Sequence, residues 1–253
     1  MDKRLRILNI WVDPLTRTEA IKRAAEILKY GQRPHTVFAS NPEKNFSIPK
    51  DPELYKVFAR ADLLLPDGIG IVWAARILYG AKIERVPGAE FMEEICKLAA
   101  QEGYTIFVYG ATEEVNRTAV EILSQRYPGL MIGGRAHGYL GPEKMPDLIQ
   151  QINESGAVIL FLALGSPKQE KWYATYGNSL KNIRLVQGVG GTLDTIAGKV
   201  PRAPEIWQKC GVEWLYRLLL EPKRLKRQKI LPLFMALILC SKIGLISRGV
   251  DRK

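Results

Sequence analysis

Short apolar runs rich in β-branched residues alternate with longer amphipathic segments along this chain, and this alternation restricts the fold more than any other feature. Residues 16–31 show the amphipathic type best, because Thr16 and Glu19 fit a capping box, an apolar face follows, and Gly31 stops the segment. The alternation predicts a layered α/β fold, in which helices flank a mostly parallel, Rossmann-like sheet. The predicted strands are residues 6–12, 35–40, 62–66, 104–110, 157–165 and 183–190. The predicted helices are residues 16–31, 51–61, 69–80, 112–127, 167–177 and 192–198.

The composition changes once, near Pro201, where the chain turns basic and aromatic. We therefore expect an α/β body over residues 1–200 and a helical appendage over residues 201–253. The full chain carries a formal charge of +11, and residues 217–253 supply +8 of it, from ten basic and two acidic side chains. Such a tail favours an anionic partner: nucleic acid, a phosphorylated ligand or an acidic membrane surface.

The tail also contains eleven consecutive uncharged residues, Ile230 to Cys240. A helix that spans a bilayer needs about 20, so this segment is too short to cross. With lysines and arginines on both sides it can lie in the headgroup region of an anionic membrane, which predicts a peripheral membrane protein. The alternative is a helix that packs on the body or on a second subunit. Nucleic acid is disfavoured, because the aromatic residues are not interleaved with the basic ones.

Three cysteines and two histidines are spaced singly, so we expect no structural metal site and no disulfide framework. The segment after residue 110 lacks a full GxGxxG run, which argues against a dinucleotide cofactor. The N-terminal apolar stretch is broken by Asp13 and Pro14 and does not resemble a signal peptide. These features predict a cytoplasmic protein without cofactor or metal.

Polar residues follow several predicted strands, and ligands bind at the carboxyl ends of parallel strands. Asp67 in "LLLPDGIG" is either a turn residue that caps the next helix or a general base whose pKa is raised at the edge of an apolar strand. Gln169 is either an exposed first-turn residue or a ligand-binding side chain. Gly190 belongs to a glycine run that forms either a diphosphate cradle or a tight turn. Further candidates at strand ends and helix starts are Asn41, Glu43, Lys168, Glu170 and Asp194.

Two more candidates lie outside these strand ends. Tyr139, in the loop "GGRAHGYLG", could stack on a base, whereas the neighbouring His137 is equally well explained as a loop histidine. Arg85 precedes a predicted helix start, where it is either a phosphate ligand or a surface charge.

The chain resembles the WecG/TagA/CpsF glycosyltransferases, glycosyltransferase family 26, through landmarks that run in order along nearly its whole length. They are "SNPEKN", "ADLLLPDGIGIVWAARILYG", "ERVPGAEF", "VYGATEEV", "HGYL", "LALGSPKQEKW", "GVGGTLDTIAGKVPRAP" and "GVEWLYRLLLEPKRLKRQ". The resemblance implies inverting, metal-independent transfer of N-acetylmannosamine from its UDP form to GlcNAc on undecaprenyl diphosphate. This reaction would serve wall teichoic acid or a related surface polymer, on the cytoplasmic membrane face. Another UDP-sugar donor, such as ManNAcA or a hexose, is the alternative within the family.

The resemblance also implies roles for single residues. Asp67 matches the proposed base, Asn41 and Gln169 match residues that line the substrate pocket, and Arg217, Arg224 and Arg227 match tail arginines that close over the site and hold diphosphate. One departure bears on donor identity, because Ala39-Ser40 stands where the family usually has Thr-Pro.

Two rival functions fit parts of the sequence. A non-enzymatic adaptor would use the basic tail to bind a membrane or nucleic acid, with the α/β body as a scaffold. A nucleotide-sugar epimerase or dehydrogenase is weakened by the missing dinucleotide fingerprint. Separately, apolar surface on the tail predicts a homo-oligomer when no membrane is present.

Overall fold

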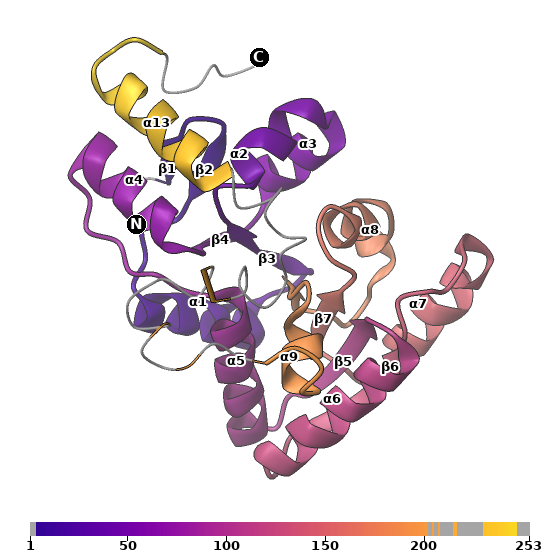
Figure 1. Ribbon diagram of the computed structural model, residues 1–253. Coiled ribbons are helices and arrows are strands. Elements are labelled where there is room, and N and C mark those ends of the chain that lie inside the picture. Colours follow the sequence, from indigo (N-terminus) through magenta and orange to yellow (C-terminus); the bar gives the residue numbers. More distant parts are fainter. Residues whose placement is uncertain (1–3, 202–203, 205–206, 208–214, 217–229, 247–253) are drawn as a thin grey trace.

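A six-stranded, entirely parallel sheet forms the centre of the molecule, as the alternating pattern predicts (Figure 1). The computed structural model describes residues 4–201, 204, 207, 215–216 and 230–246. The strands follow the spatial order β4-β3-β8-β7-β5-β6. Their bounds are β3 (His35–Ser40), β4 (Leu63–Pro66), β5 (Thr105–Gly110), β6 (Met131–Ala136), β7 (Ile159–Ala163) and β8 (Leu185–Gly188).

Helices cover both faces of the sheet, so side chains that alternate along each strand enter two different cores. On one face α1 (Arg17–Tyr30), α5 (Gly88–Glu102), α6 (Glu113–Arg126) and α9 (Thr192–Ile196) form the larger core. The other face carries α3 (Pro52–Arg60), α4 (Ile69–Tyr79), α7 (Met145–Glu154) and α8 (Lys168–Tyr176). Shorter elements are α2 (Lys44–Ser47), η1 (Ile48–Lys50), η2 (Pro142–Lys144) and η3 (Gly177–Ser179).

Local sequence signals explain where several helices begin. The capping box predicted for α1 is present, because the Thr16 side chain accepts from the Glu19 N–H while the Glu19 carboxylate accepts from the Thr16 N–H. Asp51 caps α3 and Thr112 caps α6 by accepting from the Leu54 and Val115 N–H groups, and Pro52 lies in the first turn of α3. These three helices therefore satisfy N-terminal donors with their own side chains.

The prediction of one strand over residues 6–12 was wrong. The segment is a hairpin of β1 (Leu5–Ile7) and β2 (Ile10–Val12), antiparallel and separate from the main sheet. The turn between them places Leu8 at a φ of 54°, and the Asn9 N–H donates to the Asn45 side chain. The prediction missed β6, in which Gly133 and Gly134 weaken the strand pattern; a Cβ on Gly134 would lie 2.6 Å from the Phe107 ring.

The apolar tail segment forms α13 (Ile230–Lys242), which packs along α4 beside β1 and β2 (Figure 1). Phe234 and Ile238 are completely buried in the same core as α3, α4 and the hairpin. For α13, the alternative prediction that the apolar tail segment packs on the body is therefore correct. The opposite side of α13 exposes Leu233 and Leu239, and Ile243 and Leu245 are exposed just beyond it. No helix in the described ranges is long and apolar enough to span a bilayer.

Candidate functional site

The carboxyl ends of four adjacent strands carry most of the predicted site residues. Asp67 follows β4, Asn41 follows β3, Gly190 follows β8, and Gln169 lies just beyond β7. The ends of β4 and β3 are fixed directly to each other, because the Asp67 N–H donates to the Ser40 carbonyl at 2.9 Å. The topology thus brings these four residues to one edge, where the loops of a parallel α/β sheet form ligand sites.

Asp67 does not occupy the N-cap position of the helix that follows it. The N-cap of α4 is Gly68, and no side chain forms a cap hydrogen bond there. Gly68 has a φ of 95°, a conformation that strongly favours glycine, and this sharp turn separates the strand end from the helix. The acid therefore lies between a buried strand and the uncapped N-terminus of α4.

The segment that enters α5 returns to the end of β4, which brings the backbone of Arg85 near that of Asp67. The Val86 N–H donates to the Pro66 carbonyl at 2.9 Å, and Arg85 Nη2 lies 3.8 Å from Glu90 Oε1. Helix α5 begins at Gly88 without a side-chain cap, and a Cβ there would lie 3.9 Å from the Ala39 Cβ. An arginine and an uncapped helix N-terminus at a strand end together favour an anion.

Gln169 is an internal brace of the site and not an exposed first-turn residue. Its side chain is buried at 5% exposure, and its Oε1 accepts from the Gly190 N–H at 3.0 Å. A Cβ on Gly188 would lie 2.5 Å from Gln169 Nε2, so the close approach of this amide requires glycine. Gly190 has a φ of 54°, and the glycine run forms the short turn from β8 into α9.

Asn41 and Asp194 also have structural contacts. Asn41 Oδ1 accepts from the Lys44 N–H at 3.3 Å, which closes the turn after β3. Asp194 lies in α9 and is half-buried, and its carbonyl accepts from the Lys199 N–H at 2.9 Å. Each residue thus holds a loop at the carboxyl edge, and neither contact decides its predicted role in substrate binding.

Tyr139 lies at the other end of the same edge. It follows β6, which is five strand spacings from β4, or roughly 24 Å at about 4.8 Å per spacing. The ring is 76% exposed, and the Tyr139 N–H donates to His137 Nδ1 at 3.2 Å. His137 is therefore a partnered loop residue, and Tyr139 is not brought to Asp67. Arg217, Arg224 and Arg227 lie outside the described residues.

The departure from the family motif at Ala39-Ser40 has a structural explanation. Ser40 is fully buried, and its hydroxyl donates to the Trp11 carbonyl of β2. The hydroxyl gained at this position therefore holds the hairpin against β3. Ala39 faces the start of α5 with only a methyl group, so the hydroxyl lost there is not replaced by Ser40.

The sequence interpretation missed a buried ion pair beneath this edge. Lys44 Nζ lies 2.8 Å from Glu170 Oε1, and both side chains are almost completely buried. Glu170 was recognised only as one of several polar residues after a strand, and Lys44 was not singled out. The only signal was that both lie within the conspicuous motifs "SNPEKN" and "SPKQEKW". Among the described residues, no cluster of three His, Cys, Asp or Glu side chains could hold a metal ion.

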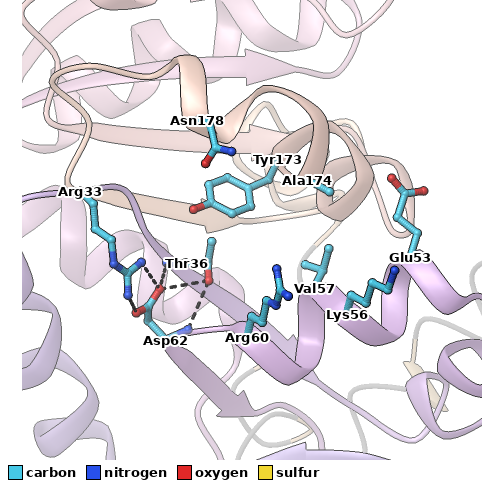
Figure 2. A pocket seen from close by; sticks show the side chains of 10 residues that line it. All are labelled: Arg33, Thr36, Glu53, Lys56, Val57, Arg60, Asp62, Tyr173, Ala174 and Asn178. Atoms are coloured by element: carbon cyan, nitrogen blue, oxygen red, sulfur yellow. Dashed lines mark hydrogen bonds and ion pairs between the residues drawn. The ribbon is translucent and has the colours of Figure 1, made fainter. Parts of the chain in front are cut away.

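A cavity of about 490 Å³ lies at the opposite, amino edge of the sheet, away from Asp67 (Figure 2). Asp62, which directly precedes β4, organises it by accepting from Arg33, from the Thr36 N–H and from His35 Nδ1. Burial raises the pKa of Asp62, but the hydrogen bonds from these groups outweigh burial and hold it below its ordinary value. This cluster holds the starts of two strands together, and it is separate from the candidate site.

We expect Asp62→Asn to lower the free energy of unfolding by about 1–3 kcal/mol near pH 7, because buried donors lose a charged acceptor. A lowered folded-state pKa contributes stability that is present above the unfolded value of about 3.9 and is lost as pH falls through the folded value. The difference between wild type and variant should therefore begin to shrink near pH 4 and decrease further below it, as measured by urea unfolding. Glu53→Gln, an exposed change in the same cavity, should alter stability by less than about 0.5 kcal/mol.

A comparison with known protein families covers nearly the whole chain. A sequence model of the glycosyl transferase WecG/TagA/CpsF family matches residues 5–248, which covers both the sheet and α13. The edge that carries Asp67, Asn41 and Gln169 is thus the candidate site of a sugar transferase. The chain belongs to the WecG/TagA/CpsF family of glycosyltransferases.

Proposed function

We propose that this protein moves N-acetylmannosamine from UDP-N-acetylmannosamine to the 4-hydroxyl of GlcNAc on undecaprenyl diphosphate, with inversion. The observation that carries the proposal is the position of Asp67, at the carboxyl end of a buried strand and beside Arg85 and Asn41. The family supplies the reaction class, and this edge supplies an acid next to groups that favour an anion.

Asp67 is the general base in this mechanism. Its carboxylate takes the proton of the acceptor 4-hydroxyl as that oxygen forms a bond to the anomeric carbon of the donor. The bond from the anomeric carbon to the UDP oxygen breaks at the same time, and UDP leaves with the electron pair. Attack from the face opposite UDP inverts the configuration at that carbon.

The departing diphosphate needs positive charge, and several groups at this edge can supply it. Helices α4, α5 and α8 all begin at the carboxyl edge without a side-chain cap, whereas α1, α3 and α6 are capped. Their N–H groups and positive dipole ends favour phosphate, and Arg85 adds a positive charge that is partly compensated by Glu90, 3.8 Å away. In the proposal, Arg217, Arg224 and Arg227 complete the diphosphate site, whereas Tyr139 lies too far along the edge to stack on the base of a donor held at Asp67.

The polyprenyl acceptor places the reaction at a membrane, so we propose that the protein is peripheral on the inner face of the cell membrane. The exposed side of α13 supports this, because Leu233, Leu239, Ile243 and Leu245 expose apolar surface in a segment that basic residues flank in the sequence. Trp73, on α4, adds an exposed aromatic ring. The buried side of α13 meanwhile fixes this surface to the body, close to the loop of Asp67.

The direct test supplies the pure protein with a panel of UDP-sugars and a polyprenyl-diphosphate-GlcNAc analogue. We expect transfer from UDP-N-acetylmannosamine and an inverted linkage, measured by mass spectrometry and NMR of the product. Transfer from UDP-ManNAcA or a UDP-hexose in its place would keep the family activity and refute the donor. The lone methyl group of Ala39 at the start of α5 makes this arm of the panel informative.

We expect Leu239→Glu combined with Ile243→Glu to weaken binding to anionic vesicles by at least about 10-fold. Each apolar side chain gains roughly 1.5–3 kcal/mol on full burial, and a new carboxylate is repelled by the anionic surface. Both residues are exposed, so the fold should be retained. Co-sedimentation at several salt concentrations measures the effect, with Glu121→Gln on the distant α6 as the control. Unchanged binding would remove α13 from the membrane contact.

A further inference from the structure

The buried pair of Lys44 and Glu170 is the least expected feature beneath the site. The side chains are 7% and 1% exposed, and Nζ lies 2.8 Å from Oε1. Lysine and glutamate are almost never fully buried unless paired, and such a pair contributes little net stability because both charges are desolvated. Net stabilisation of the fold therefore does not explain why this ion pair is buried here.

The surroundings of the pair hold both charges in one geometry. Lys44 Nζ donates to the Ser166 hydroxyl as well as to Glu170, and it lies 4.8 Å from the centroid of the Phe58 ring. Glu170 Oε2 is buried and has no hydrogen-bond partner among the described residues. Only one carboxylate oxygen is satisfied, so Glu170 depends on Lys44 for its charge compensation.

The pair connects the loops that carry the candidate site residues. Lys44 is the first residue of α2, directly after the turn that follows β3, and its N–H donates to Asn41 Oδ1 in that turn. Glu170 belongs to α8 after β7, next to Gln169, whose Oε1 accepts from the Gly190 N–H. Strand β8 lies between β3 and β7, so the pair joins the segments that follow β3 and β7, and the Gln169–Gly190 hydrogen bond joins the second of these to the turn after β8.

We propose that Lys44 and Glu170 are positioning residues, which fix the distance between the Asn41 turn and the Gln169–Gly190 brace during sugar transfer. This inference rests on the function proposed above. A charge pair with a shared hydroxyl has one favoured geometry, whereas two apolar side chains of similar volume fill the space without defining a separation. A displacement of about 1 Å at a reacting centre can cost on the order of 100-fold in rate.

The test replaces the pair by an apolar one of similar length, Lys44→Met with Glu170→Met. We expect the midpoint of thermal unfolding to equal or exceed that of the wild type, while kcat/KM for the UDP-sugar falls on the order of 100-fold. A purely structural pair would leave kcat/KM unchanged in a variant with unchanged stability. The matched control is Lys171→Met, on the same helix, whose charge pairs with Asp51 at the surface and whose activity should remain at the wild-type level.

Wild-type kcat/KM in a stable double variant would overturn the inference. If the double variant does not fold, Glu170→Gln assayed below its unfolding midpoint gives the same readout, since it keeps the shape and removes the charge. Failure of the proposed function is recognised separately, because the wild type would then transfer no sugar. In that case UDP binding by calorimetry tests the pair, with an expected loss of about 10-fold and with unchanged binding as the contrary result.

Discussion

Asp67→Asn is expected to reduce kcat for sugar transfer by about 10²–10⁴-fold while leaving UDP-sugar binding nearly unchanged. Removal of a general base costs this much because the acceptor hydroxyl must lose its proton without assistance. The amide keeps the size of the side chain, and the backbone N–H of residue 67 still holds β4 to β3. Initial rates at saturating donor measure the effect on kcat, and calorimetry with the UDP-sugar measures binding.

The matched control lies at the other end of the same strand. Asp62 directly precedes β4 as Asp67 directly follows it, so Asp62→Asn should lower stability and leave kcat intact in folded enzyme. Full activity in Asp67→Asn would remove the residue from the base role. Asp194 on α9, which is half-buried at this edge, would then be the next acid to test.

The sheet was predictable from sequence because its signals are local. Runs such as residues 35–40 and 157–163 are mostly buried. Helix starts are marked by Thr16 and Asp51, and Gly80 marks the end of α4. The hairpin in residues 5–12 was not predictable in this way. Its turn at Leu8 and Asn9 carries no glycine, and the fold imposes it through the contact between Asn9 and Asn45.

The gathering of the candidate residues at one edge was also predictable, since polar residues at the ends of parallel strands must meet there. The sequence could not assign the contacts of those residues. Gln169 supports Gly190, Ser40 bonds to the hairpin, and Lys44 pairs with a carboxylate 126 positions away. Such contacts depend on the order of strands in space, which no local pattern encodes.

The contacts of the apolar tail segment also could not be predicted from the sequence. Eleven uncharged residues are consistent with a buried helix and with a helix that lies on a membrane, and α13 combines one buried side with one exposed apolar side. Only the packing of α13 on α4 shows which of its apolar side chains are buried and which are exposed. A Cβ on Gly70 would lie 2.8 Å from Leu231 and 3.0 Å from Pro42, so α13 lies against the residues that follow Asp67 and Asn41.

Phe234→Ala is therefore expected to lower the free energy of unfolding by about 3–5 kcal/mol, the cost of a large cavity in a packed core. Phe234 is fully buried, whereas the neighbouring Leu233 is 52% exposed, so Leu233→Ala should change stability by less than about 0.5 kcal/mol. Urea unfolding of both variants measures the difference. If α13 detaches before the sheet unfolds, the transition of Phe234→Ala will divide into two steps, and protease will cleave near residue 230 first. Equal stability in the two variants would show that α13 does not depend on the body, and the link between the apolar surface and the Asp67 loop would then be lost.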